Sequence, residues 1–288
     1  MKLALGTAQF GLDYGIANQT GRVPAGEVQQ ILQLALLHQI DTLDTAIAYG
    51  ESERVLGQSG VSDWRVISKL PVVPADCSDL DGWVEQCITS SLNRLDIDIL
   101  DGLLLHQPMQ LLEPGGERLS RALSRLQTRG LVSRLGVSVY DFDALGLLMA
   151  RLPCGLIQAP FSILDQRLVQ TGWAARLRSA DVEIHARSVF LQGLLVMPPA
   201  QRPASFHLWS QTFADWDHWL YRTGLNPLEA CLRFALTSAA VDKVVVGIDS
   251  LAQLQQLLAI EHLPLVDLPT WQSSPPSELI NPSRWNKL

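Results

Sequence analysis

Four side chains capable of acid–base chemistry lie at or just after three short apolar runs. Asp44 ends the run Thr42–Asp44, and Tyr49 follows five residues later. Lys69 lies near the end of VISKL, and His106 follows the apolar residues of LLLHQP. If these runs are neighbouring parallel strands, their carboxyl ends bring an acid, a phenol, an amine and an imidazole together. Burying Lys69 costs free energy unless Asp44 pairs with it, so we expect an ion pair there.

Short apolar segments alternate with amphipathic segments along the chain. Strands are predicted at residues 3–5, 42–44, 66–70, 99–106, 135–139, 155–161, 182–188 and 243–248. Helices are predicted at residues 25–38, 51–57, 80–95, 117–129, 142–151, 168–178, 227–237 and 250–260. Runs such as DILDGLLLH are almost continuously apolar, as in parallel strands buried on both faces. Eight such units favour an α/β fold, a (β/α)8 TIM barrel with residues 1–288 in a single domain.

An open doubly wound sheet is the alternative arrangement of the same units. No G-x-G-x-x-G motif follows the first strand, which disfavours a dinucleotide-binding sheet. Gly6 and Gly11 have the spacing of a P-loop, but the Lys and Ser or Thr that should follow Gly11 are missing. These absences favour the barrel.

The alternation is interrupted by an insertion over residues 196–224, after the seventh strand. In a barrel this insertion lies on the carboxyl-terminal face. Two interpretations stay open for Trp209, Trp216 and Trp219: they form one face of a helix over the pocket, or they anchor a loop to the barrel. The Pro- and Ser-rich tail after Leu263 is predicted to be irregular and to wrap on the surface.

Composition excludes several classes of function. The net charge of −7, the pI near 5.3 and the lack of a basic run disfavour a nucleic-acid partner. Four scattered cysteines indicate neither a zinc site nor a disulfide framework. The opening residues lack the pattern of a signal peptide, and no apolar run is long enough for a membrane span, so we expect a cytoplasmic protein without a membrane partner.

Three segments carry a resemblance to a known family. LDTAIAYGESERVLG, SLNRLDIDILDGLLLHQP and LQTRGLVSRLGVSVYD occur in this order, and together they resemble the aldo-keto reductase family. The resemblance implies an NAD(P)-dependent reductase acting on a small carbonyl compound. It makes Tyr49 the general acid and Lys69 the cation that lowers the pKa of Tyr49. Asp44 would hold Lys69, and His106 would hydrogen-bond the substrate oxygen.

The same resemblance predicts the cofactor site, with NADPH as the usual family cofactor. Ser138 and Gln158 match residues that hold the nicotinamide carboxamide, while Val139 replaces the family's Asn. Arg187 occupies the position of an aromatic ring that stacks on nicotinamide, and its planar guanidinium can stack as well. Further expected cofactor contacts are Gly6, Thr7, Gln192, Gly193, Gly247, Ser250 and Gln253.

One predicted cofactor contact favours NADH instead. Asp249 stands where many relatives have a basic residue, and a carboxylate repels a 2′-phosphate. The helix amides near Ser250 and Leu251 suit an anion. NAD therefore stays open beside NADP.

The substrate pocket is assigned to loops, with Gln9 near the cofactor and Phe10 or Tyr14 beside the substrate. Trp209 and Trp216 are further candidates. The substrate and the oligomeric state are not fixed by the sequence.

Two other functions are weighed. A metal-dependent hydrolase would use Asp44, His106 and His185 as ligands, but no H-x-H pair is present and Lys69 would crowd the cation. A barrel that binds the nucleotide without catalysis, as a sensor or partner subunit, is the second alternative.

Overall fold

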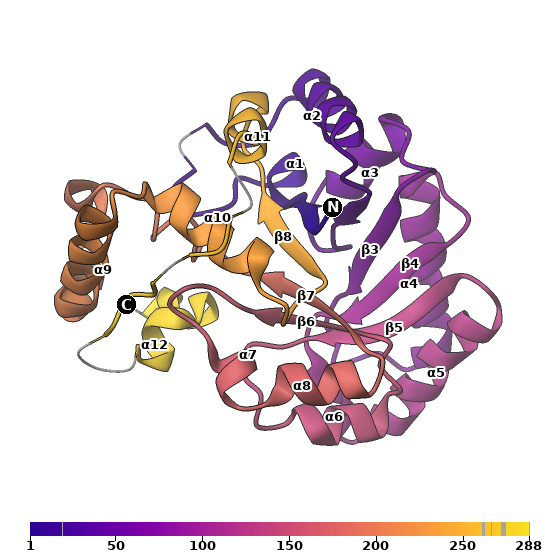
Figure 1. Ribbon diagram of the computed structural model, residues 1–288. Coiled ribbons are helices and arrows are strands. Elements are labelled where there is room, and N and C mark those ends of the chain that lie inside the picture. The colour runs from indigo at the N-terminus through magenta and orange to yellow at the C-terminus, as the bar shows by residue number, and fades with distance from the viewer. Residues whose placement is uncertain (19, 261–262, 266, 272–274, 288) are drawn as a thin grey trace.

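A closed barrel of eight parallel strands forms the centre of the computed structural model (Figure 1). The structure describes residues 1–18, 20–260, 263–265, 267–271 and 275–287, without the side chains of 286 and 287. Each strand pairs with the next along the chain, and the last pairs with the first. The strands are β1 Leu3–Gly6, β2 Thr42–Asp44, β3 Arg65–Leu70, β4 Leu100–Leu105, β5 Val132–Ser138, β6 Leu156–Pro160, β7 Glu183–Arg187 and β8 Lys243–Gly247. The predicted TIM barrel is confirmed.

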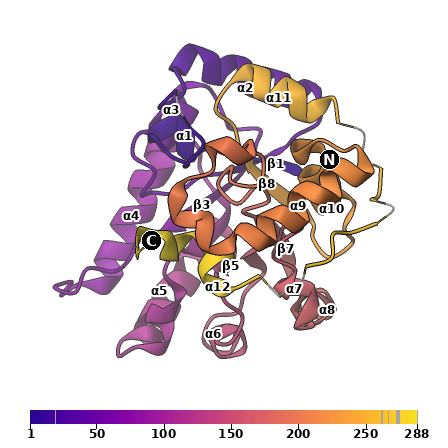
Figure 2. The same cartoon turned by 90° about the vertical axis from the view of Figure 1, so that its left-hand side faces the viewer.

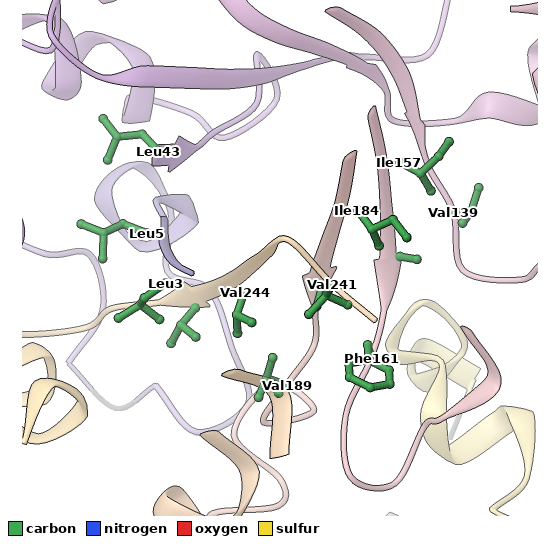
Figure 3. Close-up of a cluster of buried hydrophobic side chains, with 14 of the residues drawn as sticks. Leu3, Leu5, Leu43, Val139, Ile157, Phe161, Ile184, Val189, Val241 and Val244 are labelled. Carbon is green, nitrogen blue, oxygen red and sulfur yellow. The ribbon is translucent and has the colours of Figure 1, made fainter. Parts of the chain in front are cut away.

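Apolar side chains on both faces of the strands explain why these segments form a barrel. Ile67, Leu104 and Leu156 make a small buried cluster of their own, while a much larger cluster combines strand and helix residues. Figure 3 shows part of that larger cluster, in which Leu3 and Val244 come from the paired strands β1 and β8. Because both faces are buried, most strand positions are apolar.

Helices surround the barrel in the order that the sequence predicts. They are α2 Ala25–Leu37, α3 Ser52–Gln58, α4 Leu80–Leu95, α5 Gly116–Thr128, α6 Leu145–Arg151, α8 Trp173–Ser179, α10 Pro227–Thr237 and α11 Leu251–Leu258. Shorter elements are α1 Ala8–Gly11, α7 Arg167–Gln170, α12 Ser277–Ile280 and the 3-10 turns η1 Pro108–Leu112, η2 Pro199–Gln201, η3 Ala204–Trp209 and η4 Pro282–Lys287. None of the helices described is long and apolar enough to cross a lipid bilayer.

The single helix predicted over residues 168–178 is wrong. Two helices occupy this stretch, α7 and α8, and Gly172 separates them with a φ of +78°. Glycine adopts this left-handed conformation without steric cost, so it ends one helix before the next begins. The apolar periodicity is similar on both sides of the break and does not reveal it.

The insertion after β7 contains helix α9, Ser210–Thr223, which stands beside the barrel (Figure 1). Trp216 is fully buried, stacks on Trp219 at 5.5 Å between ring centroids and donates a hydrogen bond to the carbonyl of Leu195. Trp209 packs against Phe206. These contacts support the interpretation that the tryptophans anchor the insertion.

The carboxyl-terminal tail is not simply an irregular surface segment. Leu279 and Ile280 of α12 are buried, and Trp285 packs edge-on against Phe206 of the insertion. Figure 2 shows α12 beneath α9. The prediction failed because the tail's few apolar residues are separated by Pro and Ser and show no period.

Charged side chains from four strands meet at the amino-terminal end of the barrel. Arg65 and Arg134 each bond both Asp101 and Glu183, and His185 bonds Glu183 at 2.8 Å. Burial raises the pKa of Glu183, but the bonds from His185 and Arg65 outweigh this effect and bring the pKa to about 2. The cluster therefore closes this end of the barrel with mutually compensated charges.

Glu53 of α3 joins this helix to β3 and α4. It is 1% exposed and accepts hydrogen bonds from Ser68 of β3, Ser91 of α4 and Arg94 of α4. A buried carboxylate needs this many donors to offset its lost hydration. Both Glu53 and Arg94 lie within the sequence segments that carry the family resemblance.

We expect Glu53→Gln to lower the free energy of unfolding by about 2 to 3 kcal/mol, because it leaves the Arg94 guanidinium without its counter-charge. Urea unfolding measures the change. Glu85→Gln is the matched control, since Glu85 pairs with Arg129 on the exposed face of α4 and should cost under about 1 kcal/mol. Equal losses in both variants would contradict a special role for Glu53.

Candidate active site

A cavity of about 650 Å³ opens at the carboxyl-terminal ends of the strands. Asp44, Tyr49, Lys69 and His106 all line it. They come from the end of β2, the loop before α3, strand β3 and the residue after β4. The barrel thus brings the four residues with acid–base chemistry to one place, as the sequence predicts.

Lys69 and Asp44 form a buried ion pair at the base of the cavity. The Lys69 ammonium donates to Asp44 Oδ1 at 2.6 Å and to the carbonyl of Thr45 at 2.9 Å. The other Asp44 oxygen accepts a hydrogen bond from the Gln158 amide at 2.6 Å. Burial lowers the pKa of Lys69, and the charge of Asp44 opposes this change. The two residues compensate each other inside the protein.

Tyr49 is held by a close approach of two backbone segments. A Cβ on Gly11 would lie 1.9 Å from the carbonyl oxygen of Tyr49, so only glycine permits this contact. Gly50 follows with a φ of +54°. The phenol ring meets the His106 ring edge-on at 6.0 Å, and the Lys69 ammonium lies 5.1 Å from its centroid.

The expected effect of Lys69 on Tyr49 is wrong. Burial and the charge of Asp44 raise the pKa of Tyr49 above its ordinary value, while Arg187 pulls it down. The Asp44 carboxylate bonds Lys69 directly, so it offsets part of the charge of that cation at the phenol. No hydrogen bond joins the Tyr49 hydroxyl to Lys69 in the described part of the chain; such catalytic bonds commonly tighten only when substrate binds.

His106 is neutral near pH 7. Burial and the nearby Lys69 ammonium lower the pKa of His106 from 6.5 to about 4. A neutral imidazole keeps one ring N–H, which can donate a hydrogen bond to a substrate oxygen.

We therefore expect the ring nitrogens of His106 to titrate near pH 4 rather than near pH 6.5. Long-range ¹H–¹⁵N spectra recorded from pH 3.5 to 8 measure this, with His106→Gln to assign the signals. Since the folded state binds the proton more weakly than the unfolded state, this residue destabilises the fold as the pH falls below 6.5. An imidazolium signal at pH 6 would contradict the assignment.

Arg187 is the second cation of the cavity. Its guanidinium lies 3.8 Å from the centroid of the Tyr140 ring and donates to the carbonyl of Val139 and to the hydroxyl of Ser188. No carboxylate pairs with Arg187 among the described residues. The planar group is therefore already stacked on one aromatic ring, which the sequence did not predict.

Most of the predicted cofactor residues also line this cavity. They are Gly6, Thr7, Ser138, Gln158, Arg187, Gln192, Gly193, Gly247, Asp249 and Gln253. Ser250 is not among the lining residues: its hydroxyl caps α11 by accepting from the Gln253 amide. Gln158, expected to hold a carboxamide, bonds Asp44 in this structure.

The substrate-pocket predictions are corrected in part. Tyr14 lines the cavity, and its hydroxyl accepts a hydrogen bond from Gln192 at 3.1 Å. Phe10 is fully buried and, like Trp209 and Trp216, is not among the lining residues.

Other lining residues were missed. Ala17, Asn18, Tyr140, Phe190 and Pro282 border the same cavity. They lie in loops and in the tail, where hydrophobic periodicity gives no signal. Tyr140 alone had a sequence cue, since it stands two residues after Ser138 within a segment that carries the resemblance.

The alternative metal site is not assembled. His185 lies in the charge cluster at the opposite end of the barrel, where it bonds Glu183, while Asp44 and His106 line the cavity. Within the described residues, no three His, Cys, Asp or Glu side chains come close enough to hold a metal ion.

The amino-acid sequence is similar to those of two sugar dehydrogenases. The chain is 26% identical to L-galactose dehydrogenase of Arabidopsis thaliana over 237 residues, which is 76% of this chain and 73% of that protein. It is 29% identical over 182 residues to D-threo-aldose 1-dehydrogenase of a Pseudomonas species, covering 60% of this chain and 55% of that protein. The second match thus spans about half of the relative's length.

Solved structures share the fold. An aldo-keto reductase from Bacillus halodurans, solved in its holo form, superposes with a TM-score of 0.69 at 20% identity, covering 92% of this chain and 88% of that chain. A glycerol dehydrogenase from Gluconobacter oxydans gives the same TM-score at 19% identity, with the same coverage. The model of the aldo/keto reductase family matches residues 2–268, so this chain belongs to that family.

Proposed function

We propose that this oxidoreductase reduces an aldehyde or ketone to an alcohol with a nicotinamide cofactor, using Tyr49 as the general acid. The observation that carries the proposal is the meeting of the Asp44–Lys69 ion pair, Tyr49 and His106 in one cavity. In this role the phenol must keep its proton until the carbonyl oxygen gains charge. A phenol is already protonated at neutral pH, and the raised pKa of Tyr49 keeps it so.

The four residues have separate tasks in this proposal. The Tyr49 hydroxyl donates its proton to the substrate oxygen as negative charge develops there. His106 donates a hydrogen bond from its neutral ring to the same oxygen. Lys69 and Arg187 place positive charge near the phenolate that results, and Asp44 keeps Lys69 in position.

The cavity suits a dinucleotide. Gln9 and Asp249 both line the cavity, and a hydrogen bond joins their side chains. Amide and carboxylate oxygens can accept hydrogen bonds from ribose hydroxyls. Glycine at position 247 makes room for the Gln9 side chain, because a Cβ there would lie 2.6 Å from its amide nitrogen. Bound in this cavity, NADPH, the usual family cofactor, or NADH would supply the hydride.

We infer a small polyhydroxylated carbonyl compound as substrate, because the relatives named above act on L-galactose and aldoses. The polar lining of Tyr14, Asn18 and Gln192 supplies hydrogen-bonding groups for sugar hydroxyls. A cytoplasmic location and a single domain over residues 1–288 stay predictions.

Turnover tests the proposal. Purified protein is assayed for oxidation of NADH and NADPH with a panel of aldoses, ketoses and simple aldehydes, and for the reverse reaction with the sugars. Activity that disappears in Tyr49→Phe supports the proposal. Tight nucleotide binding without turnover on any member of the panel would favour a non-catalytic nucleotide-binding barrel instead.

A further inference from the structure

One end of the cavity is bordered by helix α11 and the residues just before it. Asp249, Gln253, Gln256 and Leu257 line it there, next to Gly247 at the end of β8. Lys69 and Arg187 are the cations among the lining residues that the structure describes. They belong to β3 and β7, not to the α11 end of the cavity. The α11 end of the cavity therefore offers a carboxylate and amides, with no cation among its described lining residues.

The amino terminus of α11 is already occupied by protein groups. Glu27 of α2 accepts a hydrogen bond from the Leu251 amide at 2.9 Å, and the Ser250 hydroxyl accepts one from the Gln253 amide at 3.2 Å. Helices α2 and α11 lie side by side, which brings Glu27 to this point (Figures 1 and 2). A phosphate reaches the Leu251 amide only by displacing the Glu27 carboxylate.

Asp249 is held in place beside this terminus. Its amide donates to Gln253 Oε1 at 2.8 Å, and Gln253 returns a hydrogen bond from Nε2 to Asp249 Oδ2 at 3.3 Å. The Gln9 side chain also hydrogen-bonds the Asp249 carboxylate. A carboxylate held in this position can accept a further hydrogen bond from a neighbouring hydroxyl but repels an anion.

We propose that Glu27 and Asp249 together make this chain selective for NADH: Asp249 accepts a hydrogen bond from the adenosine ribose, and the two carboxylates exclude a 2′-phosphate. This inference rests on the proposed function, since it assigns the cofactor of the same cavity. It adds Glu27 as a specificity residue, which acts by neutralising the positive end of α11.

Direct binding tests the inference without turnover. Quenching of tryptophan fluorescence gives the Kd of NADH and of NADPH for the intact protein. We expect NADH to bind about tenfold or more tightly than NADPH, because the two carboxylates repel the 2′-phosphate and so weaken the binding of NADPH. Asp249→Asn should weaken NADH about tenfold, since it removes a charged hydrogen-bond acceptor.

A second variant isolates the repulsion. Glu27→Gln should strengthen NADPH about fivefold and leave NADH within about twofold. Glu85→Gln removes the same charge from the exposed face of α4 and should leave both constants unchanged, because screening cancels distant charges. Thermal unfolding confirms that each variant is folded.

The outcomes separate two failures. If NADPH binds as tightly as NADH, or if neither Glu27→Gln nor Asp249→Asn changes the ratio of the two constants, the selectivity inference is overturned while the reductase proposal stands. If neither nucleotide binds, both are overturned.

Discussion

Replacing Tyr49 with Phe should lower turnover by about 10² to 10⁴, the usual contribution of a positioned general acid. The substitution removes only the hydroxyl. The ring keeps its edge-on contact with His106 and its position beside Lys69. The hydroxyl has no hydrogen-bond partner in the part of the chain that the structure describes, so stability should change little. Steady-state rates and the Kd of the nucleotide, measured on the same preparation, check this.

Two comparisons make the test specific. Tyr221→Phe makes the same chemical change on the exposed face of α9, where Tyr221 is 88% exposed, and should leave turnover unaltered. Tyr14→Phe removes a cavity hydroxyl that Gln192 bonds, and it should alter substrate KM more than turnover. Near-normal turnover in Tyr49→Phe would remove Tyr49 from the proposed mechanism.

Replacing Lys69 with Met should lower both turnover and stability. The Asp44 carboxylate is 4% exposed and would lose its counter-charge, at a cost of about 3 to 5 kcal/mol in the free energy of unfolding. Turnover should fall by about 10² to 10³, as when one electrostatic group is removed from an active site. Urea unfolding and steady-state kinetics at a temperature where the variant is folded measure the two effects.

Lys243→Met provides the matched control. Lys243 pairs with Asp41 near the opposite end of the barrel, where the Asp41 side chain is 50% exposed and can be hydrated. Its loss should cost at most about 1 kcal/mol and leave turnover intact. The double variant Asp44→Asn with Lys69→Met should recover part of the stability lost in Lys69→Met but none of the turnover. If the double variant recovers no stability, the ion pair is not the source of the instability.

The sequence predicted the barrel and the four cavity residues because both follow from local patterns. Buried strands need continuous apolar runs, and a polar residue that ends such a run lies at the mouth of the barrel. Asp44, Lys69 and His106 are all of this kind. The break at Gly172 and the buried tail were missed, because a single glycine and isolated apolar residues leave the hydrophobic period unchanged.

Electrostatic effects were harder to predict than positions. The sequence predicts that Lys69 lies near Tyr49. It does not show that the charge of Asp44 offsets part of that of Lys69, or that burial raises the pKa of the phenol. The contact between Glu27 and the α11 terminus joins residues 224 positions apart. Such a contact depends on how two helices lie side by side, which no single segment of the sequence specifies.

The charge cluster of Arg65, Arg134 and Glu183 fixes the order of events on acidification. Glu183 stays ionised until the pH approaches about 2, whereas His106 at the other end of the barrel takes up a proton near pH 4. The cluster's contribution to stability is complete above the ordinary carboxyl pKa of 4.5 and fades as the pH falls toward 2. Mild acid therefore adds a positive charge at His106 in the cavity, while the charge cluster at the other end of the barrel is still intact. Returning the pH to neutral should remove this charge without any refolding.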